Sequence, residues 1–213
     1  MNNSYTDHLK KQINDNTGTS ILRSICVHPK LRLIYFKPGK AAGTSIFRKN
    51  LQPRGGWIIQ KDNPTEFNNW VQNINDKELE NYFKFIFVRN PFSRLVSYWH
   101  DTFLSSYPNF KDLIKDGIFD KKGNLKKLHF QTQSGLFTTP GGDTLNLDFI
   151  GKVENINNDW EVLCKKINIQ YQKLGHYTKN SYNKYTTYYD NETIDIVSEW
   201  YKKDLQIFNY KFN

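Results

Sequence analysis

The stretch Leu31–Asn50, LRLIYFKPGKAAGTSIFRKN, decides the fold that we predict for this chain. Its first part, 31–36, is almost wholly apolar, which is typical of a strand buried on both faces in a parallel sheet. Pro38 and Gly39 end this strand, and an amphipathic pattern beginning after Gly43 predicts a helix. The expected order is therefore strand, tight loop and helix.

The loop between this strand and this helix has the composition of an anion-binding site. A helix N-terminus presents unpaired N–H groups and the positive end of the helix dipole. Lys40 adds a positive charge, and Thr44 and Ser45 add hydroxyl donors beside Gly43. An ordinary strand-to-helix turn with an exposed lysine would show the same pattern. A Walker A loop has its lysine after the second glycine, whereas Lys40 precedes Gly43, and this order disfavours a kinase or an ATPase.

Composition and charge limit the class of protein. The 213 residues are 38% hydrophobic, which suits one domain with one core. The formal net charge of +9 favours an anionic partner, such as a nucleotide, nucleic acid, acidic glycan or anionic membrane surface. Cys26 and Cys164 lie among apolar residues without metal-ligand spacing, so we expect buried thiols. We see no signal-peptide core and no apolar run long enough for a membrane span, and we therefore expect a cytoplasmic protein.

Periodicity along the remaining chain predicts alternating strands and helices. Residues 1–19 are polar and rich in asparagine, and we interpret them as a flexible polar arm before a single α/β domain over 20–213. Further strands are expected at 57–60, 83–89 and 145–153, and helices at 63–74, 77–82, 90–103, 109–115, 157–167 and 192–208. This alternation predicts an α/β sandwich with a central, mostly parallel sheet.

A second strand end also carries residues that bind anions. Arg89 ends the strand at 83–89, and Ser97 lies two helical turns beyond Asn90. Ligands of open α/β sheets bind beyond the carboxyl ends of the strands, so we expect one ligand with two anionic groups. The Lys40 loop would hold one group, and the Arg89 guanidinium, which can bind a phosphate bidentately, would hold the other together with Ser97. A strand-end salt bridge and a helix-surface serine are the structural alternatives for these two residues.

The motifs KPGKAAGTSI and FIFVRNPFSRLVSYW together resemble the carbohydrate sulfotransferases of the Golgi and bacterial type. The first is similar to the loop that binds the 5′-phosphosulfate in that family, and the second to its segment for the 3′-phosphate. HFQTQ and LDFIGKVENINNDW look like a third block of the family. The resemblance covers about residues 31–211 and implies a P-loop-like three-layer sandwich. Gly39 is a departure, because the family has proline and lysine adjacent where this chain has Pro38, Gly39 and Lys40.

The resemblance implies an enzyme that moves a sulfuryl group from 3′-phosphoadenosine 5′-phosphosulfate (PAPS) to a hydroxyl of a carbohydrate acceptor. The product would be adenosine 3′,5′-bisphosphate, and the displacement would be in line. Lys40 would neutralise the leaving oxygen, and no metal is expected because a sulfuryl group carries less charge than a phosphoryl group. The residues implied in donor binding are Lys40, Ala42, Gly43, Thr44, Ser45, Arg89 and Ser97.

The acceptor hydroxyl needs a general base, and histidine is the first candidate because its reference pKa is ~6.5. His129 lies in the family-like HFQTQ stretch, so we assign this role to it and expect an acidic limb near that pKa in the pH–rate profile. His100, Asp101 and Glu66 remain alternatives. The other histidines are in the polar arm, before a proline and in a tyrosine-rich segment: His8, His28 and His176.

Two other functions fit parts of the sequence. A nucleotide or nucleoside kinase on a related P-loop scaffold would need a GK[ST] sequence and a magnesium carboxylate, and we find no GK[ST]. A nucleic-acid-binding module would explain the net charge and stretches such as NKYTTYY, but no RNP, KH or zinc signature is present. The sequence leaves open the acceptor, the position sulfated and the oligomeric state.

Overall fold

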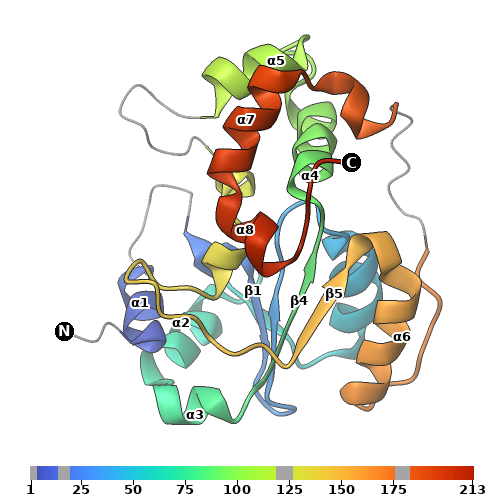
Figure 1. Ribbon diagram of the computed structural model, residues 1–213. Helices are drawn as coiled ribbons and strands as arrows, with labels where there is room; N and C mark the ends of the chain where they lie inside the picture. The colour runs from blue at the N-terminus through green and yellow to red at the C-terminus, as the bar shows by residue number, and fades with distance from the viewer. Residues whose placement is uncertain (1–3, 14–19, 119–126, 176–182) are drawn as a thin grey trace.

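A five-stranded sheet forms the centre of the computed structural model, which describes residues 4–13, 20–118, 127–175 and 183–213 (Figure 1). The strands are β1 (Ile25–His28), β2 (Leu33–Phe36), β3 (Ile58–Ile59), β4 (Phe83–Val88) and β5 (Phe149–Lys152), in the order β3-β1-β2-β4-β5. β2, β4 and β5 pair in parallel, whereas β1 pairs antiparallel with both β2 and β3. In this sheet only β1 therefore runs against the others, and the prediction of a mostly parallel central sheet is confirmed.

Helices cover both faces of the sheet and the region beyond the carboxyl ends of β2 and β4 (Figure 1). The α-helices are α1 (Tyr5–Lys11), α2 (Pro64–Asn73), α3 (Asp76–Glu80), α4 (Pro91–Tyr98), α5 (Phe110–Asp112), α6 (Ile156–Lys166), α7 (Asn191–Trp200) and α8 (Lys202–Ile207). Three segments of the described residues are π-helical: Thr44–Leu51, Trp99–Phe103 and Leu113–Gly117. The helix predicted over 192–208 is divided, because Tyr201 leaves the helical conformation and donates its hydroxyl to the Phe130 carbonyl at 2.6 Å.

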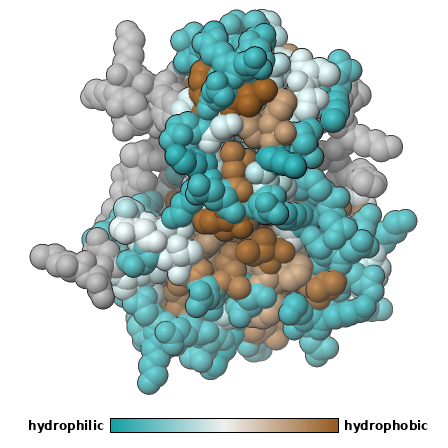
Figure 2. All heavy atoms as spheres, in the orientation of Figure 1, coloured by the Kyte–Doolittle hydropathy of each residue, from teal (hydrophilic) through white to brown (hydrophobic). Residues whose placement is uncertain are grey.

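Alternate residues of the strands fill two cores, one on each face of the sheet. In β2, Ile34 and Phe36 pack with α1, α2 and α3, whereas Leu33 and Tyr35 pack with Thr44–Leu51 and α6. All four side chains are buried, as the apolar run in β2 predicts. A third apolar cluster joins α4, α5 and α7 beyond the sheet, and Figure 2 shows hydrophobic side chains along the middle of the molecule.

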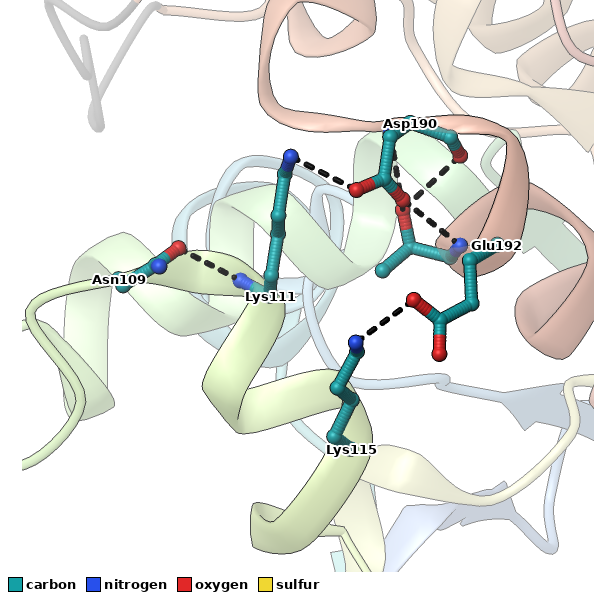
Figure 3. A network of polar contacts seen from close by, with 6 residues as sticks. Asn109, Lys111, Lys115, Asp190 and Glu192 are labelled. Carbon is teal, nitrogen blue, oxygen red and sulfur yellow. Dashed lines mark hydrogen bonds and ion pairs between the residues drawn. The ribbon is translucent and has the colours of Figure 1, made fainter.

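Two ion pairs bind α7 to the helical segment around α5 (Figure 3). Lys111 lies 2.7 Å from Asp190, and Lys115 lies 2.6 Å from Glu192. Hydrogen bonds from Lys111 and Thr193 hold the pKa of the Asp190 carboxyl well below its usual value. Because these groups are exposed, we expect the ion pairs to fix the orientation of α7 and to contribute little to the stability of the protein.

The N-terminal prediction is wrong for the part of 1–19 that the structure describes around α1. The Ser4 hydroxyl caps this helix by accepting from the Asp7 N–H at 3.1 Å. Tyr5 and Leu9, four residues apart on one helical face, are buried in the same core as α2, and the Tyr5 hydroxyl donates to the Leu136 carbonyl. Two buried apolar side chains are enough to dock this short helix, although its composition is polar.

Both cysteines are buried and unpaired, as predicted. No helix in the described part of the chain is long and apolar enough to cross a membrane.

Candidate functional site

The loop after β2 bends sharply at two residues that are not glycine. Lys40 has a φ of 63° and Ala42 a φ of 58°. This left-handed conformation costs on the order of 1–2 kcal/mol for a residue with a Cβ, and such strain is found most often at ligand-binding sites. The helix Thr44–Leu51 follows directly, with the Ile46 N–H bonded to the Ala42 carbonyl at 3.0 Å. The predicted order of strand, loop and helix is confirmed, although the helix is of the π type.

The two predicted hydroxyls of this loop have different surroundings. Thr44 is exposed at the first position of the helix. Ser45 is half-buried and donates to the Gly175 carbonyl at 3.2 Å. The Ser45 hydroxyl therefore ties the loop to the chain that follows α6, whereas the Thr44 side chain is exposed.

The Lys40 ammonium forms an ion pair with Asp101 at 3.2 Å. Asp101 lies on the π-helical continuation of α4, and its side chain is 52% exposed against 16% for Lys40. An anion that enters the loop would therefore compete with the Asp101 carboxylate for Lys40. Of the alternative bases, Asp101 lies at this site, whereas Glu66 is exposed on α2, in the helical layer on the other face of the sheet. His100 lies beside Asp101, where its ring packs edge-on against Trp99.

Arg89 follows β4, and its side chain reaches the Lys40 loop. Its Nη1 donates to the Lys40 carbonyl at 3.4 Å, and its Nε donates to Ser93 Oγ at 3.0 Å. Ser97 lies further along α4 and is only 4% exposed. The two predicted anion-binding segments are therefore brought together at the carboxyl ends of the neighbouring parallel strands β2 and β4.

A buried network fixes the backbone of Arg89. Gln133 accepts from the Arg89 N–H and donates to the Arg89 carbonyl, both at 2.9 Å. Asp204 of α8, which is fully buried, accepts from the N–H groups of Gln133 at 2.7 Å and Ser134 at 2.8 Å, and from the Ser134 hydroxyl at 2.6 Å. Asp204 was not among the residues predicted from the sequence; its one signal is that it follows Val197 by seven residues, on the apolar face of the helix predicted over 192–208.

The carboxylates of the LDFIGKVENINNDW stretch hold strand ends in place. Asp148 accepts from the Lys84 N–H at 2.7 Å at the start of β4. Glu154 accepts from the Asn90 N–H at 2.8 Å, just after the end of β4. Asp159 in α6 accepts from the Lys152 N–H at 2.6 Å at the end of β5. These three contacts explain the carboxylates of the third family-like block as supports of the sheet.

His129 lies against the Lys40 loop. Its ring stacks on Tyr98 with 4.8 Å between the ring centroids and 22° between the planes. Arg94, which is 2% exposed, donates to the His129 carbonyl at 3.1 Å and to the Gln131 carbonyl at 2.7 Å. A Cβ on Gly39 would overlap the imidazole. The glycine that separates Pro38 from Lys40 therefore makes room for His129.

Burial lowers the pKa of His129 to about 4, with further lowering by the positive charges of Arg94, Lys37 and Lys40; the Asp101 carboxylate acts in the opposite direction. In the protein without ligand, the imidazole pKa therefore lies below the reference value of ~6.5 from which the acidic limb was expected. The imidazole is neutral at pH 7, so it is able to accept a proton, although it is a weaker base than an exposed histidine.

We expect the His129 imidazole to titrate near pH 4 in a proton NMR titration, with the signal identified by its loss in His129→Gln. Because the folded pKa lies below the unfolded value of ~6.5, the unfolded chain binds the proton first as the pH falls. The contribution of this group to stability is present above pH ~6.5 and is lost as the pH falls to about 4. Denaturant unfolding at several pH values should show that the free energy of unfolding falls less on acidification in His129→Gln than in the unaltered protein. An equal fall in both proteins would contradict the low pKa of His129.

Gly39→Ala should destabilise the protein by roughly 1–3 kcal/mol, because the new methyl group overlaps the His129 ring. In a His129→Ala background, Gly39→Ala should instead stabilise the protein. Gly39 does not have a positive φ, and alanine restricts the unfolded chain more than glycine. Urea unfolding of the two single variants and the double variant measures this coupling. The same cost in both backgrounds would show that Gly39 is required for another reason.

A family model described as "Sulfotransferase family" matches residues 23–211. This range runs from just before β1 to the C-terminal segment and contains the Lys40 loop, Arg89 and His129. Searches of curated proteins and of solved structures found no match.

Proposed function

Because the chain belongs to the sulfotransferase family over residues 23–211, we propose that it transfers a sulfuryl group from PAPS to a hydroxyl of a carbohydrate acceptor. The observation that carries this proposal is the contact between the Arg89 guanidinium and the Lys40 carbonyl, which joins the two strand ends whose residues are predicted to bind anions. A nucleotide with anionic groups on both the 3′ and the 5′ oxygen of its ribose suits this arrangement better than a ligand with one anionic group.

The donor set of the site fits PAPS. The helix N-terminus at Gly43, Thr44 and Ser45, together with Lys40 and the Ala42 bend, would hold the 5′-phosphosulfate. Arg89 and Ser97 would hold the 3′-phosphate. The same seven residues were expected to bind the donor from the sequence, and their roles remain proposals.

PAPS supplies an activated sulfuryl group whose leaving group is a 5′-phosphate. We propose that the Lys40 ammonium leaves Asp101 and neutralises the oxygen that becomes negative as the bond breaks. His129, neutral at pH 7, would accept the proton of the attacking hydroxyl. Tyr98 and Arg94 hold this histidine in place by stacking and by binding its carbonyl. No step of this reaction needs a metal ion.

The proposal also covers the domain organisation and the cellular location of the protein. We propose that residues 20–213 form one P-loop-like sulfotransferase domain, and the cytoplasmic location stays a prediction. The acceptor class rests on the family resemblance. Neither rival function, the kinase or the nucleic-acid-binding module, is favoured by the family match.

Calorimetric titration separates this proposal from a kinase. Adenosine 3′,5′-bisphosphate should bind, ATP should bind more weakly, and a chelator should not change either result. Transfer of label from sulfur-labelled PAPS to a panel of sugar acceptors then tests the activity. Preference for ATP with magnesium, or affinity that chelation abolishes without unfolding the protein, would contradict the proposal.

A further inference from the structure

We propose that Lys37, the first residue of the KPGKAAGTSI stretch, is a second cation for the 5′-phosphate end of the donor. This inference rests on the proposed function and assigns part of donor affinity to a residue to which neither the sequence pattern nor the resemblance gave a role. Lys37 directly follows β2, and its N–H bonds to the Ser24 carbonyl at 2.7 Å, so its backbone is fixed at the edge of the site.

The side chain of Lys37 crosses the start of the helix Thr44–Leu51. A Cβ built on Gly43, the N-cap of this helix, would lie 3.0 Å from the Lys37 Cγ, 3.2 Å from its Cδ and 3.9 Å from its Nζ. The stem therefore runs over Gly43 and places the ammonium at the helix N-terminus. Glycine at this position leaves the space that the stem occupies.

This position is electrostatically unfavourable for a lysine in the absence of an anion. The N-terminus of a helix is the positive end of its dipole, which stabilises anions and repels cations. Lys37 has no carboxylate partner in the part of the chain that the structure describes, whereas Lys40 is paired with Asp101. The charge of Lys37 also reaches His129, where it helps to lower the imidazole pKa. An anion held between Lys37 and the helix N-terminus would remove this repulsion.

Lys37 and Lys40 would then have different roles. Lys37 is not engaged by a carboxylate, so it is available to hold a 5′-phosphate in donor and product alike. Lys40 must first leave Asp101 and would act as charge develops on the leaving oxygen. Interactions that are equal in the ground state and the transition state change the donor KM but not kcat. Lys37 is therefore expected to set donor affinity, and Lys40 to set turnover.

The test uses Lys37→Met, which keeps most of the stem but removes the charge, and Lys30→Met as a matched control. Lys30 is exposed in the turn between β1 and β2, at the opposite end of β2. Dissociation constants are measured by calorimetry for adenosine 3′,5′-bisphosphate, adenosine 5′-phosphate and adenosine 3′-phosphate. We expect Lys37→Met to weaken the two 5′-phosphorylated nucleotides by roughly 10- to 100-fold, as for loss of a charge-assisted contact, and to leave adenosine 3′-phosphate unchanged. Lys30→Met should change none of the three.

Any other result for these variants would contradict the proposed role of Lys37. Unchanged affinity for adenosine 5′-phosphate, or equal weakening of adenosine 3′-phosphate, would overturn the role of Lys37 and show that its stem only packs on the helix. If Lys37→Met does not fold, as judged by thermal unfolding, Lys37→Gln replaces it under the same criteria. Failure of the unaltered protein to bind any of the three nucleotides would overturn the proposed function together with this inference, whereas normal binding that the variants leave unchanged would overturn this inference alone.

Discussion

Lys40→Ala should lower turnover by roughly 100- to 1000-fold while changing donor affinity far less, as expected when a group that stabilises developing charge is removed. In the ground state, Lys37 and the N–H groups at the start of the helix Thr44–Leu51 remain to hold the donor. In the proposed mechanism, the ammonium of Lys40 contributes most when the leaving oxygen becomes negative. Steady-state kinetics at saturating donor, with calorimetry of adenosine 3′,5′-bisphosphate, separate the two effects.

The ion pair between Lys40 and Asp101 requires a control, because Lys40→Ala also leaves an uncompensated carboxylate beside the donor. A double variant, Lys40→Ala with Asp101→Asn, removes both charges. Its turnover should stay as low as that of Lys40→Ala, while any loss of donor affinity caused by repulsion should be recovered. Parallel losses of affinity and turnover in both variants would show that Lys40 only anchors the phosphate.

Arg89→Ala should weaken adenosine 3′,5′-bisphosphate by about 2–4 kcal/mol and adenosine 5′-phosphate much less. If Arg89 holds the 3′-phosphate as proposed, the substitution removes a bidentate, charge-assisted contact and leaves the 3′-phosphate dianion unpaired. Ser97→Ala should cost roughly 1 kcal/mol, as for one neutral donor. Competition binding with the two nucleotides measures the selectivity directly.

The other contacts of Arg89 make its control important. Its guanidinium also bonds to Ser93 Oγ and to the Lys40 carbonyl, so Arg89→Ala could disturb the first loop. Ser93→Ala removes one of these supports and leaves the guanidinium in place; it should cost no more than about 1 kcal/mol for either nucleotide. Equal weakening of both nucleotides by Arg89→Ala would mean that Arg89 holds the fold or the 5′ end.

The sequence predicted the parts of the fold that carry strong local patterns. β2 is a run of apolar residues buried on both faces, β4 is a similar run that includes Lys84, and a loop and a helix follow each strand. Because parallel neighbours present their carboxyl ends at one edge, the meeting of Lys40 and Arg89 could be expected before their contact was seen. The docking of the short α1 could not be expected from the sequence, since its burial depends on two apolar residues in a polar segment.

The contacts that shape the candidate site are long-range, and local patterns do not contain them. Gly39 and His129 are 90 positions apart, and the sequence shows the glycine only as a departure from the family. The carboxylate of Asp204 supports Gln133, and through it Arg89, from the last helix. The low pKa of His129 also depends on burial, which the residue type alone does not reveal.

The proposed base, His129, is expected to have different pKa values with and without bound donor. Without ligand, the cations Arg94, Lys37 and Lys40 help to keep the pKa of the buried His129 near 4. An anion bound at the two lysines would offset part of this charge, and we expect the imidazole pKa to rise when adenosine 3′,5′-bisphosphate binds. Asp101, which pairs with Lys40 and whose negative charge acts to raise the His129 pKa, stays the alternative base if His129→Ala keeps turnover.

Hydrogen exchange with and without adenosine 3′,5′-bisphosphate tests the central claim most directly, because it needs no acceptor. The account predicts slower exchange in two segments, 37–47 and 89–97, with little change in α3, which lies on the opposite side of the sheet from Thr44–Leu51. Arg89→Ala should remove the protection in 89–97 and keep part of it in 37–47. Binding that leaves both segments unprotected, or that protects residues elsewhere, would contradict the proposed donor site.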